Sequence, residues 1–178
     1  MQETFTLVGT LVTPLLFPII AVVVALVQIK KKSFDSLKDR LNAWLRSWFM
    51  FAVGFGALWI ALAFVIAPKY FAGNIGFTPS PFQFEVAMAN LGFAVVGFCC
   101  VRITDRAREV GMIGYLIFLF GAAVGHIIQF FVAHNDNPAN IGTIVLVDIG
   151  VPVVALLLLR ARRRLEPSVN QTDLVASR

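Results

Sequence analysis

Residues 47–68 read SWFMFAVGFGALWIALAFVIAP, an apolar run without a single charged side chain. A helix that crosses the hydrocarbon core of a bilayer needs about 20 such residues, so this run predicts a transmembrane helix. Comparable runs extend outward on both sides of it, over residues 5–29, 110–133 and 140–160. A further run, residues 81–102, contains two polar side chains near its start but is long enough to cross. The sequence therefore predicts an all-α, polytopic transmembrane helical bundle with five spans.

The composition leaves no room for a soluble module. The chain has 178 residues, of which 58% are apolar and 14% are charged, as expected for one integral membrane domain over residues 1–164. Residues 165–178 are polar and predict a disordered tail. The first apolar run has no positively charged segment before it and is too long for the core of a signal peptide. We therefore expect it to remain as the first helix.

The basic residues fix the expected orientation. All 15 Lys and Arg residues except Lys69 follow the first, third or fifth apolar run. By the positive-inside rule, this places the N-terminus outside and the C-terminus in the cytoplasm. Basic side chains at a membrane border attract anionic headgroups by about 1 kcal/mol each. The net charge of +5 thus predicts a bilayer with anionic lipids, and not nucleic acid, as the partner. The expected lipid contacts are Lys30, Lys31, Lys32, Arg160, Arg162, Arg163 and Arg164.

The segment before the second span has its own pattern. Between residues 33 and 46, apolar side chains recur at helical spacing opposite charged ones, beginning with Phe34, Leu37 and Leu41. This pattern predicts an amphipathic helix that lies on the cytoplasmic interface and continues into the second span. A short helix that packs on the protein's own loops is the equal alternative.

Three polar residues lie inside predicted spans, at similar depths. With a rise of 1.5 Å per residue, Asn90 lies roughly 12 Å, His126 about 9 Å and Asp148 about 10 Å below the outer surface. Pro152 cannot donate a helical hydrogen bond to the carbonyl of Asp148, which frees a second oxygen at this level. Polar groups inside a bilayer are costly, so their convergence on three helices needs an explanation.

Two explanations remain open. The functional one is a small cavity, open towards the outside, in which Asp148 and His126, with Asn90 beside them, bind a proton or a small cation. The structural one is that the three side chains hydrogen-bond one another and hold the helices together. Gln129 would extend the polar face outward by one turn. Glu85 is either part of the site or a surface charge that favours the start of its helix.

Metal and catalytic chemistry find less support. His126, Asp148 and Glu85 could ligate a divalent ion, but their spacing matches no metal signature. No nucleophile is placed near His126, and no hydrolase motif occurs. The sequence thus indicates no cofactor and favours a protein that is not an enzyme.

Several short motifs resemble an uncharacterised family of small bacterial inner-membrane proteins. They are Ser80-Pro81-Phe82-Gln83-Phe84-Glu85-Val86, Ala89-Asn90, Gly121-Ala122-Ala123-Val124-Gly125-His126, and Asp148 ahead of Pro152. The resemblance covers residues 76–158 and implies a multi-pass protein of the bacterial cytoplasmic membrane. It carries no activity over to this chain.

Two function hypotheses follow. The first is a proton- or cation-responsive transporter or sensor built around Asp148 and His126. The second is an accessory or assembly subunit of a larger membrane complex, in which the polar residues only join helices. In that case Gly121-x-x-x-Gly125 would serve a homodimer or a partner, although packing inside the bundle is the favoured use of this motif.

Overall fold

In the computed structural model, the chain is a bundle of long helices. The structure describes residues 11–32, 34–103 and 105–165. Within them the elements are η1 (Thr13–Leu15), α2 (Leu16–Lys32), α3 (Leu37–Ser47), η2 (Trp48–Phe55), α4 (Gly56–Ile66), α5 (Pro68–Asn74), α6 (Phe82–Cys100), α7 (Asp105–Val132), α8 (Pro138–Ile141) and α9 (Thr143–Arg163).

The prediction of five spans is confirmed. Five helical stretches of the described residues are long and apolar enough to cross a membrane. They are Thr13–Lys32, Leu37–Ile66, Phe82–Cys100, Asp105–Val132 and Pro138–Arg163. Residues 5–10 of the first predicted span and residues 166–178 of the predicted tail lie outside the described residues. The chain is thus a multi-pass, all-helical membrane protein.

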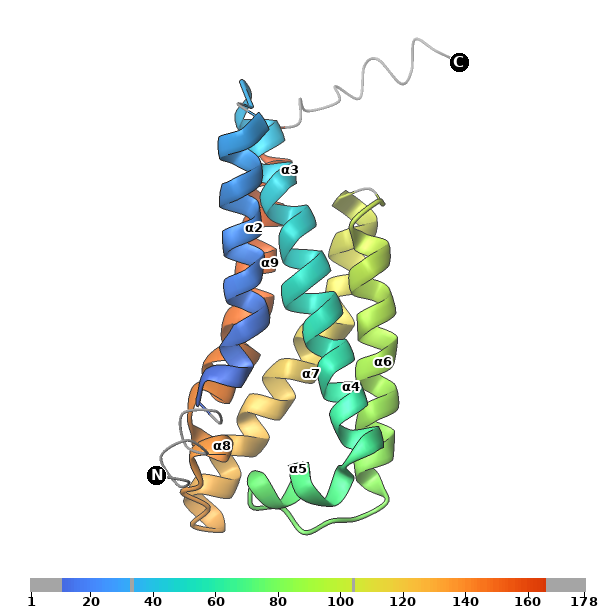
Figure 1. Ribbon diagram of the computed structural model, residues 1–178, viewed down its shortest axis with the longest axis vertical. Helices are drawn as coiled ribbons and strands as arrows, with labels where there is room; N and C mark the ends of the chain where they lie inside the picture. The colour runs from blue at the N-terminus through green and yellow to red at the C-terminus, as the bar shows by residue number, and fades with distance from the viewer. Residues whose placement is uncertain (1–10, 33, 104, 166–178) are drawn as a thin grey trace, which may run out of the picture.

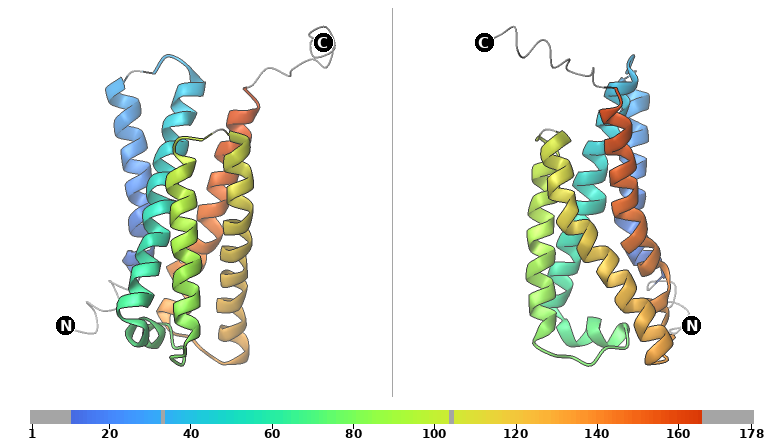
Figure 2. Two further views of the ribbon diagram at one scale, coloured as in Figure 1. Left: turned by 90° about the vertical axis from the view of Figure 1, so that its right-hand side faces the viewer. Right: turned by 180° about the vertical axis from the view of Figure 1, so that it is seen from behind.

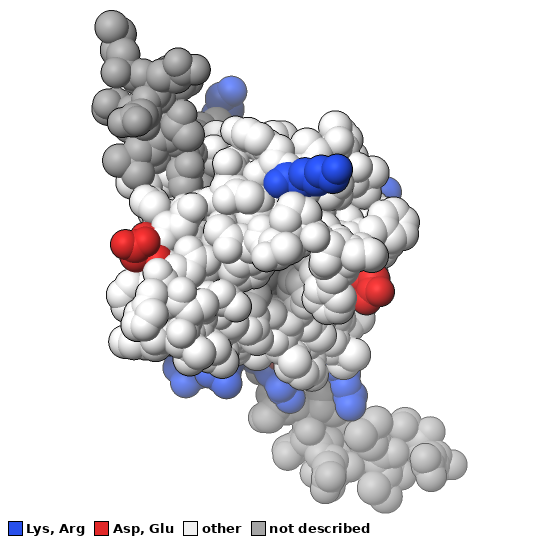
Figure 3. All heavy atoms as spheres, turned by 90° about the horizontal axis from the view of Figure 1, so that it is seen from below, with Lys and Arg blue, Asp and Glu red and all other residues white. Residues whose placement is uncertain are grey.

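The helices alternate in direction, so the bundle has two chemically different ends (Figure 1). The basic end holds the α2–α3 and α6–α7 connections and the C-terminus of α9; the opposite end holds α5 and α8. Figure 3 shows the opposite end as a mainly uncharged surface. The charged side chains in its described segments are Lys69, Glu85 and Asp136, and all three are exposed. The alternation of charge in the sequence therefore becomes a separation of charge along the bundle.

The second span is longer than predicted. Its 30 residues form one continuous helical stretch, Leu37–Ile66, in which η2 is a π-helix between two α-helices. Ser36 caps the stretch by accepting a hydrogen bond from the Asp39 amide at 3.1 Å, as Ser does at helix starts. The amphipathic segment predicted for residues 33–46 is helical from Leu37, but it continues the axis of the span instead of forming a separate helix.

The inward face of α3 explains this difference. Ala43 and Leu45 are 4% and 0% exposed and pack in the angle between α2 and α9, while the charged side chains face outward. Asn42 also accepts a hydrogen bond from Arg162 Nε at 3.2 Å. Contact with two long helices buries more apolar area than a position flat on the interface would, so the protein's own helices hold this segment.

Two glycines allow a close helix crossing between η2 and α6. A Cβ atom built on Gly97 would come within 2.6 Å of the Gly54 backbone nitrogen, so only glycine allows this approach. Gly121 and Gly125, by contrast, have open space around the position of a Cβ. The expectation that their motif packs inside the bundle is therefore wrong. Figure 2 shows α7 running obliquely across the bundle, so its glycine face is open although its opposite face packs on α9.

A different set of hydrogen bonds holds the helices together at each end of the bundle. At the basic end, Arg108 is 6% exposed and donates from Nε to the Cys100 carbonyl at 2.6 Å, while its Nη1 pairs with Asp105 at 2.5 Å. Arg162 Nε lies 3.7 Å from the other Asp105 oxygen. We call Asn42, Asp105, Arg108 and Arg162 the basic-end network. Its position turns Arg162, expected as a lipid contact, towards protein: the residue is only 7% exposed.

The connections at the opposite end form a cover. Helix α5 lies in a segment that the sequence did not predict to be helical. The loop that follows it passes through Gly76 at a φ of 75°. Asn135 holds this loop by donating a hydrogen bond to the Ile75 carbonyl at 2.8 Å. At the start of α6, Gln83 Oε1 accepts from the Ser80 amide at 2.6 Å, so this side chain ties the end of the loop to the first turn of the helix. The loop thus joins the α6 side of the bundle to the α7–α8 turn.

Candidate functional site

Asp148 is a buried carboxylate in the middle of the bundle. It lies on α9 and is 5% exposed. Its Oδ2 is buried and has no hydrogen-bond partner among the described residues. His126 Nε2 lies 3.8 Å from that oxygen. This separation is too long for a hydrogen bond, so the carboxylate faces the imidazole without being joined to it.

Asn140 fixes the protonation of the imidazole on its other side. Asn140 is fully buried, and its Nδ2 donates to two backbone carbonyls, those of His126 at 3.2 Å and Asn135 at 3.0 Å. Because a carbonyl can only accept, this orientation of the amide is the one that satisfies both contacts. The amide oxygen then points at His126 Nδ1, 2.8 Å away, so Nδ1 carries a proton and donates it to Asn140.

The consequence falls on Nε2. In a neutral imidazole with a proton on Nδ1, Nε2 has only a lone pair. This lone pair faces the carboxylate of Asp148, which also only accepts when ionised. Two acceptors opposed in a water-poor interior are unfavourable. A proton on Nε2 or on the carboxylate, or a cation beside the two groups, removes this conflict. The geometry therefore leaves the pair one proton short of a matched set.

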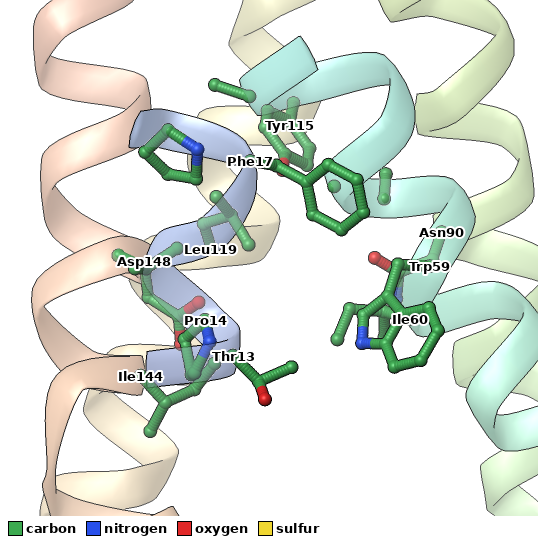
Figure 4. Close-up of a pocket in the computed structure, with 15 residues that line it drawn as sticks. Thr13, Pro14, Phe17, Trp59, Ile60, Asn90, Tyr115, Leu119, Ile144 and Asp148 are labelled. Atoms are coloured by element: carbon green, nitrogen blue, oxygen red, sulfur yellow. The ribbon is translucent and has the colours of Figure 1, made fainter. Parts of the chain in front are cut away.

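A cavity of about 60 Å³ adjoins Asp148 at the point where all five spans meet (Figure 4). One water needs roughly 10–15 Å³, whereas sites for drug-sized ligands have about 300–1,000 Å³. The cavity is therefore of a size for water molecules or a small ion and too small for an organic substrate. Its polar lining comes from five different elements: Thr13, Trp59, Asn90, Tyr115 and Asp148.

The arrangement of these side chains gives the cavity one charge. Figure 4 shows Asp148 and Asn90 on opposite sides of the space, with their side chains directed towards it. Among the described lining residues, Asp148 has the one carboxyl group, and apolar groups such as Phe17 and Leu119 complete the wall. A single negative charge among neutral oxygen atoms and hydrocarbon attracts a proton or a cation and repels anions.

The cover at the opposite end lies over His126. The Phe77 ring, from the loop between α5 and α6, lies with its centroid 6.0 Å from the imidazole at an angle of 30°. The His126 side chain is 12% exposed. Phe77 thus lies between the imidazole and the surface at the opposite end, while Asp148 lies between the imidazole and the cavity. The pair stands between the opposite end and the centre of the bundle.

The structure brings together some of the residues that the sequence singled out. Asp148 faces His126, and Asn90 lines the cavity with Asp148, although its Nδ2 donates to the Val86 carbonyl at 2.9 Å and not to His126. Glu85 is exposed on the first turn of α6 and does not line the cavity. Gln129 contributes its backbone to the turn after α7, where its carbonyl accepts a hydrogen bond from the Asn135 amide at 3.1 Å.

Sequence reasoning missed two contributors. Tyr115 precedes His126 by 11 residues, which is close to three helical turns, so the two share a face of α7; this spacing could have identified it. Asn140 was assigned only to the start of the last span. Its role depends on Gly142, where the backbone leaves the helical conformation (φ −88°, ψ −137°) and separates α8 from α9. No local pattern announces such a break.

Metal ligation finds no further support in this geometry. Across residues 11–32, 34–103 and 105–165, no group of three or more His, Cys, Asp and Glu side chains is close enough to hold a metal ion. The combination of His126, Asp148 and Glu85 considered from the sequence is not assembled, because Glu85 faces outward.

Comparison with known proteins adds a family without an activity. No curated protein and no solved structure matches the chain. One family model, that of a family of unknown function, matches residues 11–168.

Proposed function

The chain belongs to this family of unknown function (DUF6790), and we propose from its own geometry that Asp148 and His126 are a proton-exchange site within a small membrane protein. The observation that carries the proposal is the orientation of Asn140, which leaves Nε2 of His126 as an acceptor opposite the Asp148 carboxylate. A proton taken up by either group turns this contact into a donor–acceptor pair. The protein is then a proton-responsive transporter or sensor.

The geometry favours exchange over a purely structural contact. Polar side chains that only join membrane helices form short hydrogen bonds, each contributing about 0.6–1.7 kcal/mol. Asn140 has three such bonds, from 2.8 to 3.2 Å, and fits that description. Asp148 does not, because its Oδ2 has no hydrogen-bond partner among the described residues and lies 3.8 Å from the imidazole. A buried carboxylate left in this state is a poor connector and a good proton acceptor.

The orientation of the protein follows from the same proposal. We place the basic end in the cytoplasm and the opposite end, with His126 beneath Phe77, on the outside of a bacterial inner membrane. The exposed basic residues, among them Lys30–Lys32, Arg160, Arg163 and Arg164, then contact anionic headgroups. Protons reach the pair from the outer side, and the protein responds to external pH.

Infrared spectroscopy of the purified protein tests the proposal. Protonation of Asp148 produces the carbonyl stretch of a carboxylic acid, which shifts in D₂O, as pH falls from 9 to 5. We expect this band in the wild type and in Glu85→Gln, a control variant that removes an exposed carboxyl group from the same protein. We expect its loss in Asp148→Asn and a changed midpoint in His126→Gln. A wild-type band that Asp148→Asn leaves unaltered contradicts the proposal.

One observation favours a second candidate, an accessory or assembly subunit of a larger membrane complex. Gly121 and Gly125 lie one turn apart with open space around them, and exposed Ile117, Val124 and Ile128 share the same helix. Small residues on a lipid-facing helix allow a second helix to approach. Purification in a mild detergent separates the candidates: a stable complex with other chains, disrupted by Gly121→Leu, supports the subunit, whereas a lone monomer or dimer contradicts it.

A further inference from the structure

The central cavity has features that proton exchange alone does not use. A proton needs only the Asp148–His126 contact, yet the same carboxyl group also borders a cavity of about 60 Å³. Neutral oxygen atoms reach this cavity from three other elements, through Thr13 on η1, Asn90 on α6 and Tyr115 on α7. Hydroxyl, amide and carboxylate oxygens are the ligands that hard, weakly polarising cations prefer.

We propose that this cavity binds a dehydrated alkali-metal cation, held by the Asp148 carboxylate with the side-chain oxygens of Asn90 and Tyr115, in competition with the proton on the Asp148–His126 pair. This inference rests on the proposed proton exchange, because the two ions share one carboxylate. It assigns to the cavity a ligand class that the proton site by itself does not require.

Charge matching decides the class of ion. Asp148 supplies one negative charge, so a monovalent cation leaves the site neutral, whereas a divalent cation leaves a net positive charge among hydrocarbon side chains. The divalent sites of proteins gather several carboxylates, and no such cluster occurs among the described residues. An anion is repelled. The apolar remainder of the wall, with Phe17, Ile60 and Leu119, offers nothing to a hydrated ion, so the ion enters without most of its water.

The neighbours of Asp148 allow proton and cation to exclude one another. The titratable groups that face it are His126 and Tyr115, both on α7; the polar residues lining the cavity from η1, α4 and α6 are Thr13, Trp59 and Asn90, which do not titrate. Within the described residues, no Lys or Arg reaches this level to replace the cation. Each ion neutralises the same carboxylate, so the uptake of one requires the release of the other.

Titration of the purified chain with LiCl, NaCl and KCl, in detergent at pH 8.5, tests the inference. Choline chloride serves as the control for ionic strength. Trp59 lines the cavity, so its fluorescence reports occupancy, and calorimetry measures the affinity independently. We expect a saturable response to at least one alkali cation, whose apparent dissociation constant rises by up to about tenfold for each pH unit below the midpoint of protonation. Asp148→Asn abolishes it.

Two further variants refine the result. Asn90→Ala removes a neutral ligand and is expected to weaken binding by about tenfold or more, while Glu85→Gln, which alters an exposed carboxyl group on the same helix, leaves it unchanged. Circular dichroism and gel filtration show that each variant is folded. A response equal to that of choline overturns the inference, as does binding that survives Asp148→Asn. If the infrared band of Asp148 titrates while no alkali cation binds, the proton site stands and the cation site fails. If neither occurs, both fail.

Discussion

Replacement of Asp148 by Asn gives the sharpest prediction, because it separates a functional carboxylate from a structural one. Asn has the same shape as a protonated Asp, and its amide can donate to the Nε2 lone pair of His126. In the wild type, Oδ2 of Asp148 is buried without a hydrogen-bond partner among the described residues. A buried polar atom left in this way destabilises a protein by about 1–3 kcal/mol. A hydrogen bond between membrane helices contributes about 0.6–1.7 kcal/mol.

At high pH, the removal of the unpaired oxygen and the gain of a hydrogen bond both stabilise Asp148→Asn relative to the wild type. In the proposed proton-exchange site, the wild type at pH 8.5 has an ionised carboxylate opposite an imidazole acceptor 3.8 Å away, whereas Asp148→Asn can close this gap as a neutral donor. We expect the free energy of unfolding of the variant to be equal to that of the wild type or higher by about 1–2 kcal/mol. At pH 5.5, where the wild type can take up the proton that Asn mimics, the difference becomes smaller.

The measurement is reversible unfolding in mixed detergent–SDS micelles at both pH values, followed by circular dichroism. Asp148→Leu, which removes both oxygens, serves as a comparison because it cannot donate to Nε2. A loss of more than about 1 kcal/mol in Asp148→Asn at pH 8.5 would refute the reasoning, since a surface contact or a merely tolerated group changes stability by less than about 0.5 kcal/mol. Such a loss would mean that the carboxylate itself joins the helices.

Three further predictions concern packing, the cover and the basic end. Gly97→Ala places a Cβ within 2.6 Å of backbone and should lower the free energy of unfolding by about 1–3 kcal/mol. Gly121→Ala, with open space around it, should change that free energy by less than about 0.5 kcal/mol. A larger loss of stability in Gly121→Ala would contradict the helix arrangement. Phe77→Ala should accelerate the modification of His126 by diethyl pyrocarbonate, measured by peptide mass spectrometry, because the ring covers the imidazole; an unchanged rate would exclude this role. Arg108→Leu removes hydrogen bonds to two carbonyls at the end of α6 and an ion pair and should destabilise the protein by about 3–5 kcal/mol in the same unfolding assay, so a nearly neutral effect would show that the network is dispensable.

Much of the fold could be predicted because bilayer physics acts on local sequence. Apolar length defines a span, and the distribution of basic residues defines the direction of each helix. The same physics indicated the level of Asp148 and His126, since depth follows from residue number once the ends of a span are known. In the structure Nε2 of His126 lies 3.8 Å from Oδ2 of Asp148, and the role of the two residues stays a prediction.

The rest depended on contacts between distant segments. The π-helix of η2 accompanies the approach of Gly54 to Gly97, two glycines more than 40 residues apart. The role of Asn140 depends on the break at Gly142 and on carbonyls in the preceding turn. The partial burial of α3 depends on α2 and α9 together. None of these arrangements produces a periodic pattern of residues, so they could not be predicted from a single sequence.

The basic-end network has a mechanical consequence. Asp105 holds Arg108 and approaches Arg162, so the terminal turns of three spans are fastened to one another on that side. At the other end, Asn135 holds the loop after α5, and Thr143 Oγ1 donates a hydrogen bond to the Leu11 carbonyl at 2.7 Å, which joins the last span to the first. Charged groups therefore join the helices at the basic end, and neutral amide and hydroxyl groups join them at the opposite end, so contacts of different chemistry hold the two ends.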